Sequence, residues 1–263
     1  MITNTKATIV RDVSRLAVKA RRFDTGLFVV EGPQAVRELL QWDPSSVVDI
    51  FHTATLMTRY PDLYEMAVRS SATVDEVSEA VLVAMADTVT PQGIIAVAQL
   101  RDAGLAALKG ARLVAICHEV RDPGNAGTII RAADAAGADA VVLTGDSVDL
   151  HNPKLVRSTT GSMFHLPIIE HHNLQDVINA VRAEGGVVLA AALGGTSLLE
   201  ERQNLAQPTA WLFGNEARGL DAESESYADR SVSVPLYGKA ESLNLATAAS
   251  VCLYESAFAQ RQG

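Results

Sequence analysis

Five polar residues between positions 125 and 244 have types and spacings that could support chemistry. They are Asn125 and Arg131 in residues 118–131, Glu216 in residues 211–220, and Ser242 and Asn244 in residues 232–246. Each group follows a short apolar segment that is typical of a buried strand. Amides, carboxylates and guanidinium groups can orient a hydroxyl, accept its proton or stabilise a developing anion. Because ligands of open parallel sheets bind beyond the carboxyl ends of the strands, these three loops are the first candidates for a site.

Each loop also has a plain structural interpretation. Arg131 lies among apolar neighbours and is either a surface charge on a buried stem or a fixed anion clamp. Glu216 lies between two glycines, which permit a close approach to a ligand but also make an ordinary turn. Ser242 and Asn244 could simply cap the last helix, and Asn125 could cap the helix that follows it. Taken singly, the three loops leave both interpretations open.

The elements that would position these loops alternate between strand and helix. Strands are predicted over residues 27–30, 47–51, 93–100, 113–117, 140–144, 187–193, 210–213 and 232–236. Helices are predicted over residues 33–41, 58–70, 75–86, 126–136, 153–161, 174–183 and 242–259. This alternation predicts an α/β fold with a mostly parallel sheet covered on both faces. The Ala- and Gly-rich residues 101–110 suggest a boundary between domains 1–104 and 105–263.

Composition excludes several classes of protein. Hydrophobic residues make up 48 % of the 263 residues and charged residues 20 %, which fits neither a disordered chain nor a membrane bundle. Two cysteines exclude a disulfide scaffold and a cysteine zinc site. The adjacent His171 and His172 do not have the spacing of metal ligands on a helix, so no metal is expected. No secretory signal is visible at the N-terminus, and we expect a cytoplasmic protein.

Charge is unevenly distributed. The chain has a net charge of −9, yet residues 1–30 hold six basic and two acidic residues, a net charge of +4. Such a segment is either a solvated helix face or a surface for phosphates.

Taken together, the three loops resemble those of the SpoU/TrmH family of S-adenosylmethionine-dependent RNA 2′-O-ribose methyltransferases, within the SPOUT class. The loops read HEVRDPGNAGTIIR, WLFGNEARGL and VSVPLYGKAESLNLA. The fragments LFVVEG, TPQGI, NPKLVR and FHLP at residues 27–32, 90–94, 152–157 and 164–167 are also similar to the family. The resemblance covers almost the whole chain. It implies a C-terminal domain with a trefoil knot, a small N-terminal α/β domain that binds RNA, and a homodimer whose active site is completed across the interface.

The resemblance also implies residue roles. Cofactor contacts are expected at Leu193, Gly214, Val234, Leu236, Ser242 and Leu243. Gly, Val and Leu in loops suit an adenine ring, which needs an apolar slot and backbone hydrogen bonds. The catalytic set is expected to be Asn125, Arg131, Glu216 and Asn244. Arg131 would stabilise the developing alkoxide or fix an RNA phosphate, since a guanidinium does not accept a proton at neutral pH. Glu216 would orient Arg131 or Asn125, or act as the base itself.

The family commonly has glycine where this chain has Ala217, which puts the path of that loop in question. RNA contacts are expected at Arg15, Lys19, Arg21 and Arg22. The substrate is expected to be 23S ribosomal RNA. The alternatives are a transfer-RNA methyltransferase and a non-catalytic RNA-binding or ribosome-assembly factor. A nicotinamide enzyme is disfavoured because the chain has no Gly-x-Gly-x-x-Gly fingerprint.

Overall fold

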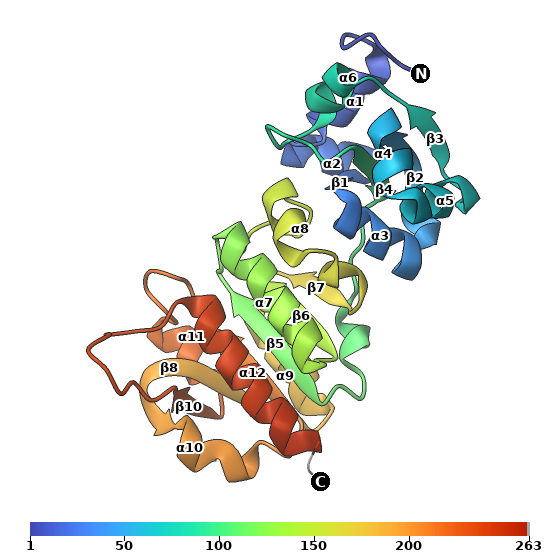
Figure 1. Ribbon diagram of the computed structural model, residues 1–263. Coiled ribbons are helices and arrows are strands. Elements are labelled where there is room, and N and C mark those ends of the chain that lie inside the picture. The colour runs from blue at the N-terminus through green and yellow to red at the C-terminus, as the bar shows by residue number, and fades with distance from the viewer. Residues whose placement is uncertain (262–263) are drawn as a thin grey trace. The chain divides into compact units, whose positions relative to one another are not determined.

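The computed structural model describes residues 1–261, which form two compact units. Unit 1 comprises Met1–Arg101 and His151–His165. Unit 2 comprises Asp102–Leu150 and the described residues from 166 onward. Figure 1 shows both units with their helices and strands labelled.

Unit 1 is built on a four-stranded sheet in the order β1-β4-β2-β3. β4 runs antiparallel to β1 and β2, and β3 runs parallel to β2. The strands are β1 (Leu27–Glu31), β2 (Val47–His52), β3 (Thr73–Glu76) and β4 (Ile94–Gln99). The helices are α1 (Thr8–Arg15), α2 (Lys19–Thr25), α3 (Pro33–Trp42), α4 (Ala54–Arg59), α5 (Pro61–Arg69), α6 (Glu79–Met85) and α8 (Pro153–Thr159), with 3-10 turns at Pro44–Ser46 and Ser162–Phe164.

Two helix predictions in unit 1 were wrong in detail. The predicted helix 58–70 is two helices, α4 and α5, and α5 begins at Pro61, whose ring nitrogen has no hydrogen to continue a helix. The predicted helix 75–86 begins only at Glu79, because the Ser78 hydroxyl caps it by accepting the N–H of Val81 at 3.3 Å. The residues just before it form the edge strand β3.

Unit 2 is built on a parallel six-stranded sheet in the order β10-β8-β9-β5-β6-β7. The strands are β5 (Leu113–His118), β6 (Ala140–Thr144), β7 (Ile168–His171), β8 (Val187–Ser197), β9 (Thr209–Phe213) and β10 (Arg230–Ser233). The helices are α7 (Pro123–Ala136), α9 (Leu174–Ala183), α10 (Leu198–Glu201), α11 (Ala222–Ser226) and α12 (Leu245–Arg261), with 3-10 turns at Leu105–Leu108 and Arg202–Asn204. The predicted α/β fold with a parallel sheet is confirmed.

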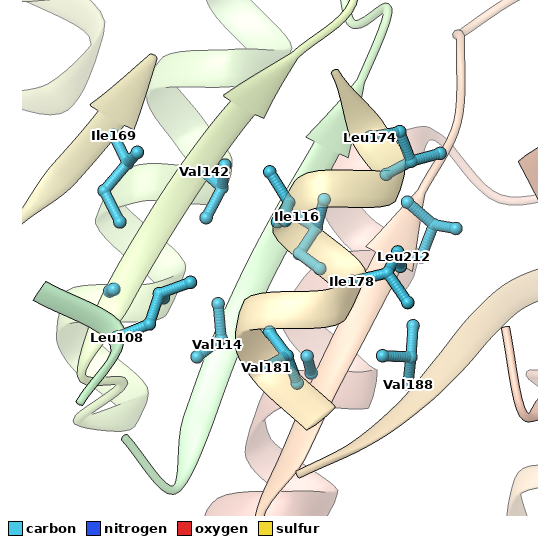
Figure 2. Packing of buried hydrophobic residues seen from close by; sticks show 13 residues of the cluster. Leu108, Val114, Ile116, Val142, Ile169, Leu174, Ile178, Val181, Val188 and Leu212 are labelled. Carbon is cyan, nitrogen blue, oxygen red and sulfur yellow. The ribbon is translucent and has the colours of Figure 1, made fainter. Parts of the chain in front are cut away.

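Helices cover both faces of this sheet, as side-chain alternation along its strands requires. Figure 2 shows Ile178 and Val181 of α9 packed over Val114 and Ile116 of β5. Residues one position out of phase face the other way: the buried Trp211 of β9 donates its indole N–H to the Ser256 hydroxyl of α12 at 2.8 Å. The sheet is therefore fixed from both sides, and its carboxyl edge is left for the loops.

Candidate functional site

The three sequence loops extend from the same edge of the unit 2 sheet. They follow β5, β9 and β10, which run parallel, so their carboxyl ends meet at one edge. We call residues 118–131, 211–220 and 232–246 loops 1, 2 and 3. Figure 1 shows the chain leaving the sheet after β10 and returning as α12.

Loop 2 holds loop 1 in place through Glu216. Its carboxylate oxygens accept the backbone N–H groups of Arg121 at 3.3 Å and Asp122 at 3.0 Å. Hydrogen bonds to a carboxylate are stronger than neutral ones, and two of them on neighbouring amides fix the direction of the chain. The structure therefore gives Glu216 a contact with the loop 1 backbone.

Two further contacts reinforce the junction between the loops. The Asn215 side chain donates to the Glu119 carbonyl at 2.9 Å, and the Arg218 guanidinium pairs with the Glu119 carboxylate. Glu119 has a φ of 55°, which a non-glycine residue adopts only where its surroundings hold it there. These contacts provide that restraint, so the start of loop 1 is over-determined by loop 2.

Loops 1 and 3 are joined by an amide pair. Asn244 donates from its Nδ2 atom to the Asn125 side-chain oxygen at 3.0 Å, while its own oxygen accepts the N–H groups of Ala246 and Thr247. Asn244, not the predicted Ser242, is thus the N-cap of α12. The cap of α7 is Asp122, whose carboxylate accepts the N–H of Asn125 at 2.8 Å. The predicted cap role of Asn125 was wrong, and its side chain is left to meet Asn244.

Arg131 stands apart from these residues. It lies on α7 six residues after Asn125 and is exposed. Within residues 1–261 it makes no hydrogen bond or ion pair. The structure therefore brings Asn125, Glu216 and Asn244 together around loop 1 but does not bring Arg131 to them within one chain.

The residues predicted to bind a cofactor lie around the ends of β8, β9 and β10. A Cβ atom on Gly214 would lie 2.4 Å from the Gly219 carbonyl carbon, so only glycine permits this turn of loop 2. Leu193 is 73 % exposed, in a stretch of β8 where the pairing with β10 breaks register. Val234, Leu236 and Leu243 are half-buried and Ser242 is exposed. This edge combines a close backbone turn with aliphatic side chains that still face solvent, an arrangement that suits a flat heteroaromatic ring.

The backbone at position 217 does not require a glycine. The left-handed residue of the loop 2 turn is Gly219, with a φ of 68°, and two backbone bonds between Asn215 and Gly219 close the turn. The departure from the common pattern therefore leaves the backbone path unstrained.

One polar pair near the site was not found from the sequence. The His118 imidazole at the end of β5 lies 3.1 Å, Nε2 to Oγ, from the hydroxyl of Ser224 on α11. Burial lowers the pKa of His118 below its ordinary value, which favours the neutral ring at the start of loop 1. The two residues are 106 positions apart in the sequence. The position of His118 at the end of a strand is the one sequence feature that could have indicated this pair.

The four basic residues predicted to contact RNA divide into two groups. Arg15 and Lys19 are exposed on α1 and α2, and Arg21 is half-exposed, 3.8 Å from Asp12. Arg22 is buried, and its guanidinium donates to the carbonyls of Leu16 at 2.7 Å and Ala17 at 2.9 Å. Arg22 therefore stabilises the turn between α1 and α2, and its charge is not presented to a partner.

Across the described part of the chain, no helix is both long enough and apolar enough to cross a membrane.

Comparison with known proteins covers nearly the whole chain. Residues 112–254 match the SpoU rRNA Methylase family, and residues 7–96 match the MRM3-like substrate binding domain. The chain is 38 % identical to the 23S rRNA (guanosine(2553)-2′-O)-methyltransferase RlmP of Bacillus subtilis, over 96 % of this chain and 97 % of that protein. It is 31 % identical to the 23S rRNA (guanosine-2′-O-)-methyltransferase RlmB of Bordetella pertussis, over 89 % and 98 %. Among solved structures, an AdoMet-bound rRNA methyltransferase from Sinorhizobium meliloti superposes with a TM-score of 0.83 at 32 % identity, covering 97 % of this chain and 96 % of that one.

Proposed function

We propose a function for this chain, which belongs to the SpoU rRNA methylase family. It methylates the 2′-oxygen of a ribose in 23S ribosomal RNA, and it does so in the cytoplasm. The donor is S-adenosylmethionine. One observation carries the proposal: three loops from separate strands are tied together at one sheet edge, by Glu216 on the loop 1 backbone and by the Asn125–Asn244 pair. This arrangement places amide side chains at the same sheet edge as the half-buried aliphatic side chains.

The proposed cofactor contacts are Leu193, Gly214, Val234, Leu236, Ser242 and Leu243. Their fit rests on the tight turn at Gly214 and the half-buried aliphatic side chains at the same edge. When bound, S-adenosylmethionine supplies a methyl group activated by a sulfonium. The knotted path of the C-terminal segment belongs to this proposal, and it is supported by the return of α12 from the edge strand β10 to pack on α7, β5 and β9.

The chain's own residues would orient the ribose and assist loss of its proton. Asn125 and Asn244 hold each other's side chains, so their free donor and acceptor positions are fixed before RNA arrives. Such preorganisation holds a hydroxyl in line with the methyl group. Arg131 would stabilise the developing alkoxide or hold a phosphate. Glu216 would act by fixing loop 1, since both of its carboxylate oxygens accept from backbone amides.

We further propose that the active form is a homodimer in which Arg131 serves the site of the second copy. Arg131 is exposed on α7. The neighbouring helix α12 carries two exposed aromatic rings, Tyr254 and Phe258, whose centroids are 5.6 Å apart. The Tyr254 hydroxyl reaches the Ala135 carbonyl of α7 at 3.4 Å, so the two helices form one continuous surface. Exposed aromatic side chains of this kind are enriched at protein interfaces.

Residues 1–104 are the proposed RNA-binding domain and residues 105–263 the proposed methyltransferase domain. The matches at residues 7–96 and 112–254 support this division. Arg15, Lys19 and Arg21 are the proposed phosphate contacts. Arg22 is left out because its guanidinium is buried on backbone carbonyls.

The proposal is tested by transfer of a labelled methyl group from S-adenosylmethionine to 23S ribosomal RNA. We expect transfer by the wild type, and a loss of at least a hundredfold in Asn125→Ala, whose amide holds Asn244. Asn179→Ala is the matched control, because Asn179 is an exposed asparagine on α9. Cofactor binding without transfer to any form of the RNA would contradict the assigned substrate, and equal activity in both variants would contradict the assigned site.

A further inference from the structure

The first two helices carry an exposed surface of unusual composition. Its members are Arg11, Arg15, Val18, Lys19 and Phe23, which we call the α1–α2 surface. Phe23 is 60 % exposed and Val18 is 59 % exposed, while the three basic side chains all reach solvent. The rest of the chain is strongly acidic overall, so this concentration of positive charge is local.

The surface is held rigidly by what lies beneath it. Val10 and Val13 of α1 and Leu16 directly after it are buried in the core of unit 1, so Arg11 and Arg15 are directed outward from the opposite side of the helix. The buried Arg22 guanidinium closes the turn between the helices by binding the carbonyls of Leu16 and Ala17. The Phe23 ring, exposed on α2 directly after this fixed turn, is available for binding without a prior rearrangement.

A cation lies beside that ring. The Lys19 ammonium is 5.6 Å from the centroid of Phe23, one helical turn away on the same face of α2. Arg11 and Arg15 share a face of α1, since they are four residues apart. An exposed aromatic ring with a cation beside it, on helices that carry further exposed basic residues, suits single-stranded nucleic acid: bases stack on such rings and basic side chains contact the phosphates.

We propose that the α1–α2 surface binds an unpaired stretch of RNA, with one base stacked on Phe23 and adjacent phosphates on Lys19, Arg15 and Arg11. This inference rests on the proposed function, because it assumes that unit 1 holds the RNA substrate. The occupant is single-stranded, since the bases of an A-form duplex are stacked on each other and offer no free face to a side chain. Positive charge favours RNA over a protein partner here, because phosphates supply the matching charge at every nucleotide.

The test uses the full chain and fluorescence anisotropy with two probes, a labelled unstructured 12-nucleotide RNA and the same strand in a perfect duplex. Phe23→Ala should weaken binding of the single strand about tenfold and binding of the duplex less than twofold. Phe23→Trp should keep the affinity for the single strand, because it keeps a stacking face. Val68→Ala is the matched control, since it removes a similarly exposed apolar side chain on α5, outside the α1–α2 surface, and it should have no effect.

Charge should separate from stacking in the same assay. Lys19→Gln is expected to weaken both probes to a similar extent and to reduce the slope of log affinity against log salt by about one. Equal affinity of Phe23→Ala and wild type for the single strand would overturn the inference, and so would an equal loss on both probes. If the wild type methylates ribosomal RNA and Phe23→Ala binds the single strand as tightly as the wild type does, this inference alone is overturned. A wild type that binds no RNA and transfers no methyl group would overturn the proposed function with it.

Discussion

Two inactive variants are expected to restore activity when paired in one dimer. On α7, Arg131 follows Asn125 by six residues, which is about 9 Å along the helix axis and about 120° around it. Asn125 is hydrogen-bonded to Asn244, so Arg131 lies away from the amide pair of its own chain. If each site takes Arg131 from one copy and Asn244 from the other, the two substitutions remove side chains that different copies supply to one site.

The expected magnitude follows from counting sites. In a heterodimer of Arg131→Ala with Asn244→Ala, one site carries both substitutions and the other carries neither. The heterodimer should therefore have about half the wild-type activity per dimer, while each homodimer has almost none. The matched control pairs wild type with a chain that carries both substitutions. There, each site lacks one group, and the activity should be almost zero.

Both heterodimers can be isolated by co-expressing the two chains with different affinity tags and purifying on each tag in turn. Labelled methyl transfer to 23S ribosomal RNA is then measured at saturating RNA. Sites complete within one chain give the opposite pattern, with no activity in the first heterodimer and half in the control. That pattern would refute the shared site, and failure to recover any doubly tagged species would refute the dimer.

Further predictions concern single residues. Arg22→Met should lower the free energy of unfolding by about 3 kcal/mol in urea denaturation, because two hydrogen bonds from a charged group to carbonyls are lost; a loss below about 1 kcal/mol would contradict the buried role. Gly214→Ala should weaken S-adenosylmethionine binding at least tenfold by calorimetry, whereas Gly238→Ala, where a Cβ meets nothing within 4 Å, should leave it unchanged. Glu216→Gln should lower kcat with the same pH–rate profile as wild type; loss of the acid limb would instead identify Glu216 as the base. Because burial lowers the pKa of His118, the unfolded chain binds its proton first as pH falls below about 6.5, so the wild type should lose more stability than His118→Gln between pH 7.5 and 5.5 in thermal melts.

The strand ends were predictable because local signals agree there. The strands found over Leu113–His118 and Thr209–Phe213 match the predicted ones within one residue, since each is a short run of apolar residues bounded by polar loops. Parallel pairing then places the following loops at one edge. This reasoning was enough to bring Asn125, Glu216 and Asn244 into one neighbourhood from sequence, and the Glu216 and Asn244 contacts show how they meet.

What the sequence could not indicate depends on contacts between distant residues. Arg22 is indistinguishable from Arg21 in a charge count, and only the turn between α1 and α2 buries one of them. Asn244 and Ser242 are both good helix caps, and the choice between them depends on the bond from Asn244 to Asn125 in another loop. The edge strand β3 was not predicted, and its last two residues were included in the predicted helix 75–86, because four exposed or half-exposed residues carry little periodic signal.

The proposed reaction places the methyl group on a ribose oxygen, and alkaline hydrolysis of the labelled RNA distinguishes this product from a methylated base. Alkali cleaves RNA through the free 2′-hydroxyl, so a 2′-O-methylated nucleotide survives in a dinucleotide. Label in a single alkali-resistant dinucleotide of 23S ribosomal RNA, absent with Asn125→Ala, is the predicted result. Label released entirely in mononucleotides would place the methyl group on a base and contradict the account.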